Sequence, residues 1–207
     1  VKRSLMQGRG DVLIVAPSAK VVSDWIEVGK LLNLPITELP DTKSAGRGVV
    51  VTTHANFRGN AALNQRDFHL VVVDEAHHLL SNEAGQFTAG LEAFRKAANH
   101  PDALQRKAQE RILGPWPQQE AFADKGAYRS AVEAHNRKAF ENREAIAAEQ
   151  KRLSDVGSKA IFLSATPFAY HKSLQLGDGY LYTLPKEGRT GYNVPQGFDR
   201  LLAESFG

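Results

Sequence analysis

Short, almost uninterrupted apolar runs alternate along the chain with stretches of helical period. The runs occupy residues 11–16, 48–53, 68–74 and 159–164 and are rich in valine, isoleucine and leucine. Such runs are typical of strands that are buried on both faces of a parallel sheet. Between the first two runs, apolar residues of 21–32 recur every three or four positions, which predicts an amphipathic helix. Because strands that alternate with helices imply right-handed crossovers, we expect an α/β fold with a parallel sheet flanked by helices.

The stretch between residues 79 and 158 has a different pattern. It lacks strand-like runs and is rich in Ala, Gln, Glu, Lys and Arg. Its apolar positions predict a short helix over 104–112 and one long amphipathic helix over 128–153, with Gly114-Pro115-Trp116-Pro117 as the break between them. Two interpretations remain open for these helices: a solvated hairpin, or an arm that contacts nucleic acid or a partner protein.

The domain organisation follows from this contrast. We expect a sheet domain over 1–80 and 158–207 that is interrupted by a helical insertion over about 85–157. An edge strand is predicted at 179–184, and helical patterns occur at both ends of the chain, over 1–6 and 198–207. Since both patterns are cut short, we expect the 207 residues to be one partial domain of a longer protein.

Composition narrows the class of protein only slightly. With 42% hydrophobic and 24% charged residues, the chain does not resemble disordered, collagen-like or coiled-coil proteins. No run approaches the roughly 18 apolar residues of a membrane span, and no secretory signal opens the chain, so we expect a cytoplasmic protein without a membrane partner. The absence of cysteine excludes disulfides, thiolate metal sites and cysteine nucleophiles. A net charge of +3 permits a polyanionic partner without requiring one.

Two adjacent carboxylates, Asp74 and Glu75, follow the apolar run 68–73. Ligands of open parallel sheets bind at the carboxyl ends of strands, which is where these residues are predicted to lie. One carboxylate suits a hydrated Mg²⁺, and the other suits the orientation or deprotonation of an attacking water. A metal hydrolase with Asp74, His77 and His78 as ligands is a weaker alternative, because adjacent histidines point to different sides and no third histidine has a useful spacing.

Three further segments carry small, hydroxyl or imidazole side chains at predicted strand ends. They are Ser164-Ala165-Thr166, the pair Pro17-Ser18, and Thr52-Thr53-His54. Backbone amides, hydroxyls and helix N-termini can hold phosphates without reading bases, so the last two segments are candidates for contact with phosphate groups. Asn56 and Arg58 are weaker candidates for the same surface. Competing structural roles are a helix cap for Ser18 and a core position for Trp25.

In this order the segments resemble the conserved motifs of superfamily 2 DEAD/DEAH-box helicases and translocases. Asp74-Glu75-Ala76-His77 is similar to motif II, and Ser164-Ala165-Thr166 is similar to motif III. Residues 13–18 with Asp24-Trp25 resemble motif Ia of chromatin-remodelling-type translocases, and residues 50–54 resemble motif Ib. The resemblance covers about residues 11–167 and implies the first RecA-like motor domain of an ATP-dependent enzyme. Phe168-Ala169-Tyr170-His171 and Gly177-Asp178-Gly179-Tyr180 are similar to strawberry-notch-like helicases of phages and mobile elements.

The resemblance implies a role for each matching residue. Asp74 would hold Mg²⁺ through water, Glu75 would activate the water that attacks ATP, and His77 would couple the ATP site to the nucleic acid. Ser164, Ala165 and Thr166 would relay the nucleotide state. Pro17, Ser18, Thr52, Thr53 and His54 would contact the nucleic-acid backbone. The implied partners are a nucleic acid, with DNA favoured over RNA, and a second RecA-like domain of the same protein.

Two features depart from the family pattern. The link between Asp74 and Ser164 is longer than usual, and the helical insertion fills it. The phosphate-binding pattern Gly-x-x-x-x-Gly-Lys-Ser/Thr occurs nowhere in the 207 residues. We therefore expect these residues alone to be inactive as an ATPase, while the parent protein hydrolyses ATP. The alternative is a nucleic-acid-binding or scaffold module that has lost hydrolysis.

Overall fold

The computed structural model describes residues 10–41, 43, 46–79 and 84–164, with the side chains of 77 and 84–88 excepted. The strand predicted at 179–184 and the helical patterns at 1–6 and 198–207 lie outside the described residues. No helix among the described residues has the length and apolar character that a membrane crossing requires.

The described residues form an α/β fold around one all-parallel sheet. Its five strands lie in the order β2 (Ile36–Glu38), β3 (Val49–Thr53), β1 (Asp11–Ala16), β4 (Phe68–Asp74) and β5 (Lys159–Leu163). The four strands predicted from apolar runs are confirmed to within one residue at each end. The three-residue strand β2 was not predicted, because it is short and lies between two prolines.

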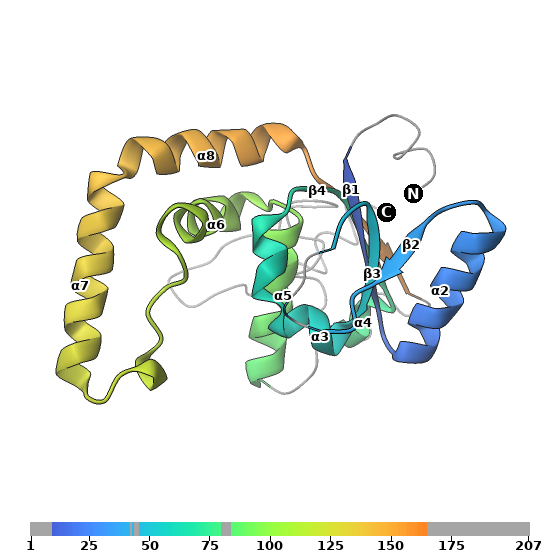
Figure 1. Ribbon diagram of the computed structural model, residues 1–207, viewed down its shortest axis with the longest axis horizontal. Helices are drawn as coiled ribbons and strands as arrows, with labels where there is room; N and C mark the ends of the chain where they lie inside the picture. The colour runs from blue at the N-terminus through green and yellow to red at the C-terminus, as the bar shows by residue number, and fades with distance from the viewer. Residues whose placement is uncertain (1–9, 42, 44–45, 80–83, 165–207) are drawn as a thin grey trace, which may run out of the picture.

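Helices cover both faces of this sheet (Figure 1). On one face, α2 (Ala19–Leu31) packs on residues such as Val12, Ile14 and Val72. On the other face, α3 (His54–Gly59) and α5 (Ala84–Ala97) pack on residues such as Leu13 and Val71. Because side chains alternate along a strand, β1, β3 and β4 each supply both cores, which explains why β1 is buried along almost its whole length.

Shorter helical segments join these elements. The 3₁₀ helix η1 (Ala61–Gln65) leads into β4, and α4 (Ala76–Leu79) follows β4. α5 lies very close to the end of α4, because a Cβ on Gly90 would lie 2.7 Å from the carbonyl oxygen of Leu79. Gly90 is therefore needed for the contact between α4 and α5.

The remaining helices form a second layer outside α5. They are α6 (Pro101–Leu113), α7 (Lys125–Glu141) and α8 (Arg143–Val156), with the 3₁₀ helix η2 (Gln119–Ala121) between the first two. Leu104 and Ala108 of α6 pack against Ile146 and Leu153 of α8 in a small apolar cluster of their own. Within the predicted insertion, α5 thus belongs to the sheet core, and the separately packed part is residues 101–156, here named the helical extension.

The long helix predicted over 128–153 is two helices in the structure. The break is at Asn142, whose side-chain Nδ2 and main-chain N–H both donate to the carbonyl oxygen of Lys138, at 2.9 Å each. Side-chain amides that bond to nearby carbonyls compete with helix continuation. The apolar period continues through Asn142, so the pattern alone could not locate the break. The predicted break at residues 114–117 is confirmed, since α6 ends at Leu113.

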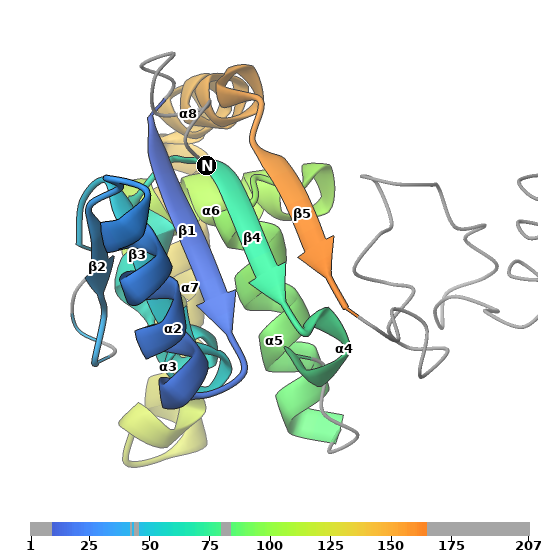
Figure 2. The same cartoon turned by 90° about the vertical axis from the view of Figure 1, so that its right-hand side faces the viewer.

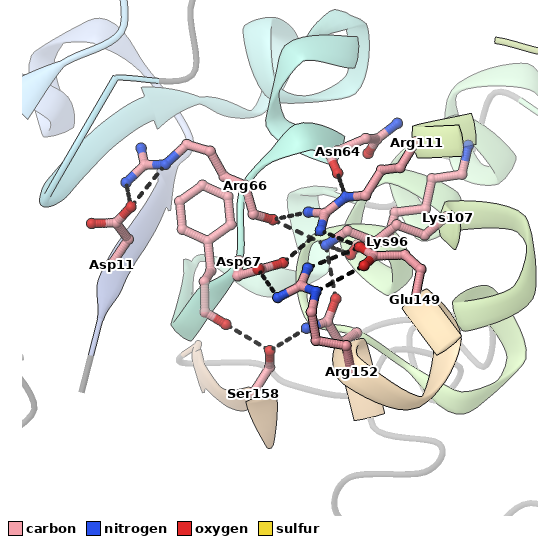
Figure 3. A network of polar contacts seen from close by, with 12 residues as sticks. Asp11, Asn64, Arg66, Asp67, Lys96, Lys107, Arg111, Glu149, Arg152 and Ser158 are labelled. Carbon is pink, nitrogen blue, oxygen red and sulfur yellow. Dashed lines mark hydrogen bonds and ion pairs between the residues drawn. The ribbon is translucent and has the colours of Figure 1, made fainter. Parts of the chain in front are cut away.

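The helical extension is attached to the sheet at the ends where the strands begin (Figure 2). A polar network makes the attachment (Figure 3). Arg111 of α6 donates to the carbonyl oxygens of Asn64 and Arg66, at 2.7 and 2.8 Å, and forms ion pairs with Asp67 and Glu149. Arg152 of α8 adds a contact of 2.6 Å to Asp67.

Lys107 is the most deeply buried charged residue of this network and has no exposed surface. Its Nζ donates to the carbonyl oxygens of Arg66 and Lys96, at 3.1 and 2.9 Å, and to Oδ1 of Asn99 at 2.8 Å (Figure 3). Burial, with the nearby Arg111 charge, lowers the pKa of Lys107 from 10.5 to about 7. Three acceptors therefore satisfy an amine that is only partly charged at neutral pH.

Asn99 and Ser158 flank the two ends of the helical extension and contact each other. The Asn99 Nδ2 donates to the Ser158 hydroxyl at 3.0 Å, and that hydroxyl donates to the Phe68 carbonyl oxygen at 2.6 Å. The chain thus leaves the sheet layer after α5 and returns to β5 at the same place.

Candidate active site

The predicted site residues gather at the carboxyl edge of the sheet. Ala16 pairs with Thr53, Val15 pairs with Val73, and Asp74 pairs with Leu163. The ends of β1, β3, β4 and β5 are therefore level with one another, as Figure 2 shows for β1, β4 and β5. Pro17-Ser18, His54, Glu75 and Ser164 each follow one of these strand ends. Ligands of open parallel sheets bind at this edge.

Asp74 is the last residue of β4 and is half-buried. By strand alternation its side chain lies on the face of Leu70 and Val72, which is the face that α2 covers. Its Oδ1 accepts a hydrogen bond of 3.0 Å from the main-chain N–H of Glu75. Its Oδ2 accepts one of 2.9 Å from the indole Nε1–H of Trp25 on α2. Each carboxylate oxygen keeps acceptor capacity for a further ligand.

Glu75 turns the chain out of the strand. Its φ is +45°, in the left-handed region that non-glycine residues seldom occupy. Its carbonyl oxygen accepts a hydrogen bond of 2.8 Å from the N–H of His78. Because strained backbone of this kind clusters at functional sites, the conformation supports a functional role for the turn. The backbone of Glu75 is left-handed, whereas that of Asp74 is extended as part of β4. The two adjacent carboxylates therefore leave the main chain in different directions.

His54 connects the end of β3 with the end of β4. Its Nε2 lies 2.9 Å from the main-chain carbonyl oxygen of Asp74. Burial, together with the nearby Arg58 charge, lowers the pKa of His54 from 6.5 to about 4. The ring is therefore neutral at pH 7, and because a carbonyl oxygen only accepts, Nε2 carries the proton.

The predicted nucleic-acid contacts divide into exposed and internal side chains. Ser18 is exposed, and its hydroxyl accepts a hydrogen bond of 3.4 Å from the N–H of Val21, as expected for a helix cap. Pro17 and Thr53 are half-buried, and Thr53 accepts from the N–H of Asn56 at the start of α3. The side chains of Thr52 and His54 are buried.

Like His54, Thr52 and the two weaker candidates are hydrogen-bonded to main-chain oxygens inside the fold. The Thr52 hydroxyl donates to the Leu39 carbonyl oxygen at 3.1 Å. Among the weaker candidates, Asn56 donates to the Pro40 carbonyl oxygen at 2.9 Å, and Arg58 donates to that of Leu79 at 3.2 Å. These side chains shape the edge from within, and the exposed hydroxyl in the predicted set is that of Ser18.

Part of the predicted site lies outside the residues and side chains that the structure describes. The main chain of His77 is in α4, but its side chain is not described. Ala165 and Thr166 lie outside the described residues, whereas Ser164 is half-buried directly after β5. The roles expected for His77 and for Ala165 and Thr166 stay predictions.

Sequence reasoning missed the contact between Trp25 and Asp74. The helical period of 21–32 identifies Trp25 as an inward residue, and it does pack beside Val22 on the sheet. The missed signal is the alternation of side chains along β4, which places Asp74 on the same face of the sheet as Leu70 and Val72. A tryptophan N–H on the covering helix then has a carboxylate within reach.

The donor set at this edge fits a partly hydrated divalent cation. Among the described residues, no group of three or more His, Cys, Asp and Glu side chains is arranged around a common point. A metal held mainly by protein ligands is thus not supported by the described part of the chain. Mg²⁺ usually takes one or two carboxylates and completes its shell with water and phosphate oxygens, and Asp74 can supply one such carboxylate.

A separate cavity of about 470 Å³ lies beside the helical extension, away from Asp74. Trp116 and His135 line it and contact each other, with ring centroids 4.8 Å apart. Lys96 is paired with Glu92 and Glu110, and Arg106 is paired with Glu92. The two cations and two carboxylates of the lining therefore balance. Nothing in this lining indicates a particular ligand.

A comparison with models of protein families and with curated proteins finds no match for this chain.

Proposed function

We propose that the chain is the first RecA-like motor domain of an ATP-dependent nucleic-acid helicase or translocase of superfamily 2. The observation that carries the proposal is the position of Asp74 and Glu75. Asp74 is the last residue of β4, which lies between two parallel neighbours, and Glu75 follows it at the same edge of the sheet as Ser18 and His54. The order of the motifs along the chain supports the same assignment.

In this proposal the two carboxylates have different roles. Asp74 would hold Mg²⁺ through water, and the bound ion would supply positive charge to the phosphate oxygens of ATP. Glu75 orients the attacking water and accepts its proton. His77 and the segment Ser164-Ala165-Thr166 couple this chemistry to the nucleic-acid side.

The nucleic-acid backbone is proposed to contact the ends of β1 and β3. Ser18, exposed at the start of the thirteen-residue helix α2, offers a hydroxyl and nearby main-chain amides. Thr52 and His54 support this surface from within, since their side chains are buried. DNA is favoured over RNA by the resemblance of the segment to DNA translocases.

A phosphate-binding loop has to come from outside these 207 residues in this proposal. One feature of β5 is consistent with an additional segment beside it. Ala160 and Phe162 pack on the core shared with α5, whereas Ile161 and Leu163, on the opposite face, are 43% and 38% exposed. A strand and helix that carry the loop would cover these apolar side chains, and a second motor domain would complete the enzyme.

The proposal is tested on the longer protein that contains this sequence. We expect nucleic-acid-stimulated ATP hydrolysis that Glu75→Gln abolishes while ATP binding is kept. Glu144→Gln is the matched control, because the Glu144 side chain is 92% exposed on α8. Equal turnover in Glu75→Gln and Glu144→Gln contradicts the role of Glu75, and comparing stimulation by DNA and by RNA decides the substrate.

A second function has one observation in its favour, the lack of the phosphate-loop pattern in the 207 residues. The chain would then be a nucleic-acid-binding or scaffold module without hydrolysis. Salt-dependent DNA binding by a longer protein that neither binds nor hydrolyses ATP would favour this alternative.

A further inference from the structure

Trp25 and Asp74 are 49 positions apart in the sequence and meet at the carboxyl edge of the sheet. Trp25 lies in the second turn of α2, where its ring packs on the apolar face of the sheet. Its Nε1–H extends beyond that core and reaches Oδ2 of Asp74 at 2.9 Å. A half-buried indole combines a large apolar body with one N–H that needs an acceptor, and here the acceptor is a carboxylate.

The two hydrogen bonds of the Asp74 carboxylate come from different directions. The main-chain N–H of Glu75 contacts Oδ1, and the indole contacts Oδ2. Two donors on two oxygens restrict rotation of the carboxylate plane, whereas one donor alone would leave a broad range of χ2 angles accessible. The remaining acceptor positions are thereby held in one orientation. Hydrogen bonds to an ionised group are also stronger than those between neutral groups.

We propose that Trp25 is a positioning residue for Asp74 and sets its affinity for a divalent cation. The inference rests on the proposed function for the identity of the ligand, and it adds a residue whose expected place was the core. Partners that orient metal ligands typically change metal affinity by about 10- to 100-fold when they are removed. A tryptophan that only filled the core would give no such effect once packing was preserved.

The first experiment tests the contact itself on the 207-residue chain. The chain has two tryptophans, Trp25 and Trp116, so ¹⁵N labelling gives two indole signals, which Trp116→Phe and Trp25→Phe assign. We expect Asp74→Ala to move the Trp25 signal and to leave that of Trp116 in place. Asp24→Ala is the matched control, because Asp24 is an exposed carboxylate adjacent to Trp25 in sequence. A Trp25 signal that responds equally to both substitutions overturns the inference.

The second experiment tests the positioning role with Mn²⁺ as the probe. Its paramagnetic broadening of the Glu75 amide signal measures binding at Asp74 without any need for turnover. We expect Trp25→Phe to weaken the apparent Mn²⁺ affinity about tenfold or more, and Trp116→Phe to leave it unchanged. If Trp25→Phe folds poorly, benzothienylalanine at position 25 takes its place, because this residue keeps the size of the indole but lacks the N–H. We expect the same loss of Mn²⁺ affinity for it.

The outcomes separate this inference from the proposed function. Equal Mn²⁺ affinity in folded Trp25 and Trp116 variants overturns the role of Trp25 and leaves the metal site standing. Absence of any broadening at Glu75, in a protein whose Trp25 signal still depends on Asp74, contradicts the metal site of the proposed function and with it the role of Trp25.

Discussion

The imidazole of His54 donates a hydrogen bond from Nε2 to the main-chain carbonyl oxygen of Asp74 over 2.9 Å. The first residue of α3 is thus bonded to the last residue of β4. This bond requires a proton on Nε2, and burial keeps the ring neutral at pH 7 by lowering the His54 pKa to about 4.

A pH dependence of stability follows from this shift. The unfolded chain takes up a proton on His54 near pH 6.5, and the folded chain only near pH 4. Between these values the unfolded state binds more protons, so the free energy of unfolding falls as the pH is lowered, by up to about 3 kcal/mol. Urea unfolding from pH 7 to 4 should show a smaller fall in His54→Gln than in the wild type. His69→Gln is the control, and a loss of slope in both variants would remove the assignment to His54.

Lys107 predicts a second pH dependence, at higher pH. The unfolded chain keeps the proton on this amine up to about pH 10.5, and burial makes the folded chain release it near pH 7. Between these values the unfolded state binds more protons, so the free energy of unfolding rises with pH, by at most about 1.4 kcal/mol per unit. Lys107→Met should show a shallower rise from pH 7 to 10, and an unchanged slope would contradict a buried, partly neutral lysine.

The two arginines of the network should differ in their contribution to stability. The Arg111 side chain is 9% exposed and that of Arg152 is 48% exposed, although both contact Asp67 and Glu149. Removal of one partner from a buried ion pair destabilises by about 3–5 kcal/mol, so we expect that range for Arg111→Leu. For Arg152→Ala we expect about 1 kcal/mol or less. Denaturant unfolding measures both, and similar losses would mean that burial does not determine their contributions.

The left-handed backbone of Glu75 predicts that glycine at this position relieves strain, although it removes the carboxylate that the proposed function needs. A left-handed residue with a Cβ costs about 1–2 kcal/mol, and glycine avoids this cost. Glu75→Gly should therefore be more stable than Glu75→Ala, although neither supplies a carboxylate. At Glu133, exposed within α7, the order should reverse because glycine is a poorer helix former than alanine by about 1 kcal/mol. The same order at both positions in thermal unfolding would contradict the strain at Glu75.

The sheet could be predicted from the sequence largely because its strands are buried on both faces. Continuous apolar runs such as 11–16 and 68–74 admit few other structures, and their bounds agree with β1 and β4. The break at Asn142 could not be predicted, since it depends on one side-chain amide within an unbroken apolar period. Local hydrogen bonds of this kind are invisible to periodicity.

For the site, position was easier to predict than side-chain environment. Strand ends place Ser18, His54 and Asp74 at one edge, which topology alone implies. Whether a hydroxyl faces solvent depends on tertiary contacts, as Thr52 illustrates, whose hydroxyl is bonded inside the fold. The contact of Trp25 with Asp74 belongs to the same category, because it joins residues that no local pattern relates.

The contact between Asn99 and Ser158 has a consequence for how the gene can change. Because the two ends of the helical extension meet there, residues 100–157 begin and end at one point of the sheet layer. A short turn between Asn99 and Ser158 would preserve the succession of β4, α5 and β5 and leave Asp74 untouched at the opposite edge. Insertions and deletions between Asn99 and Ser158 therefore leave the candidate active site unchanged. We expect relatives of this chain to differ in length at this junction more than within the strands of the sheet.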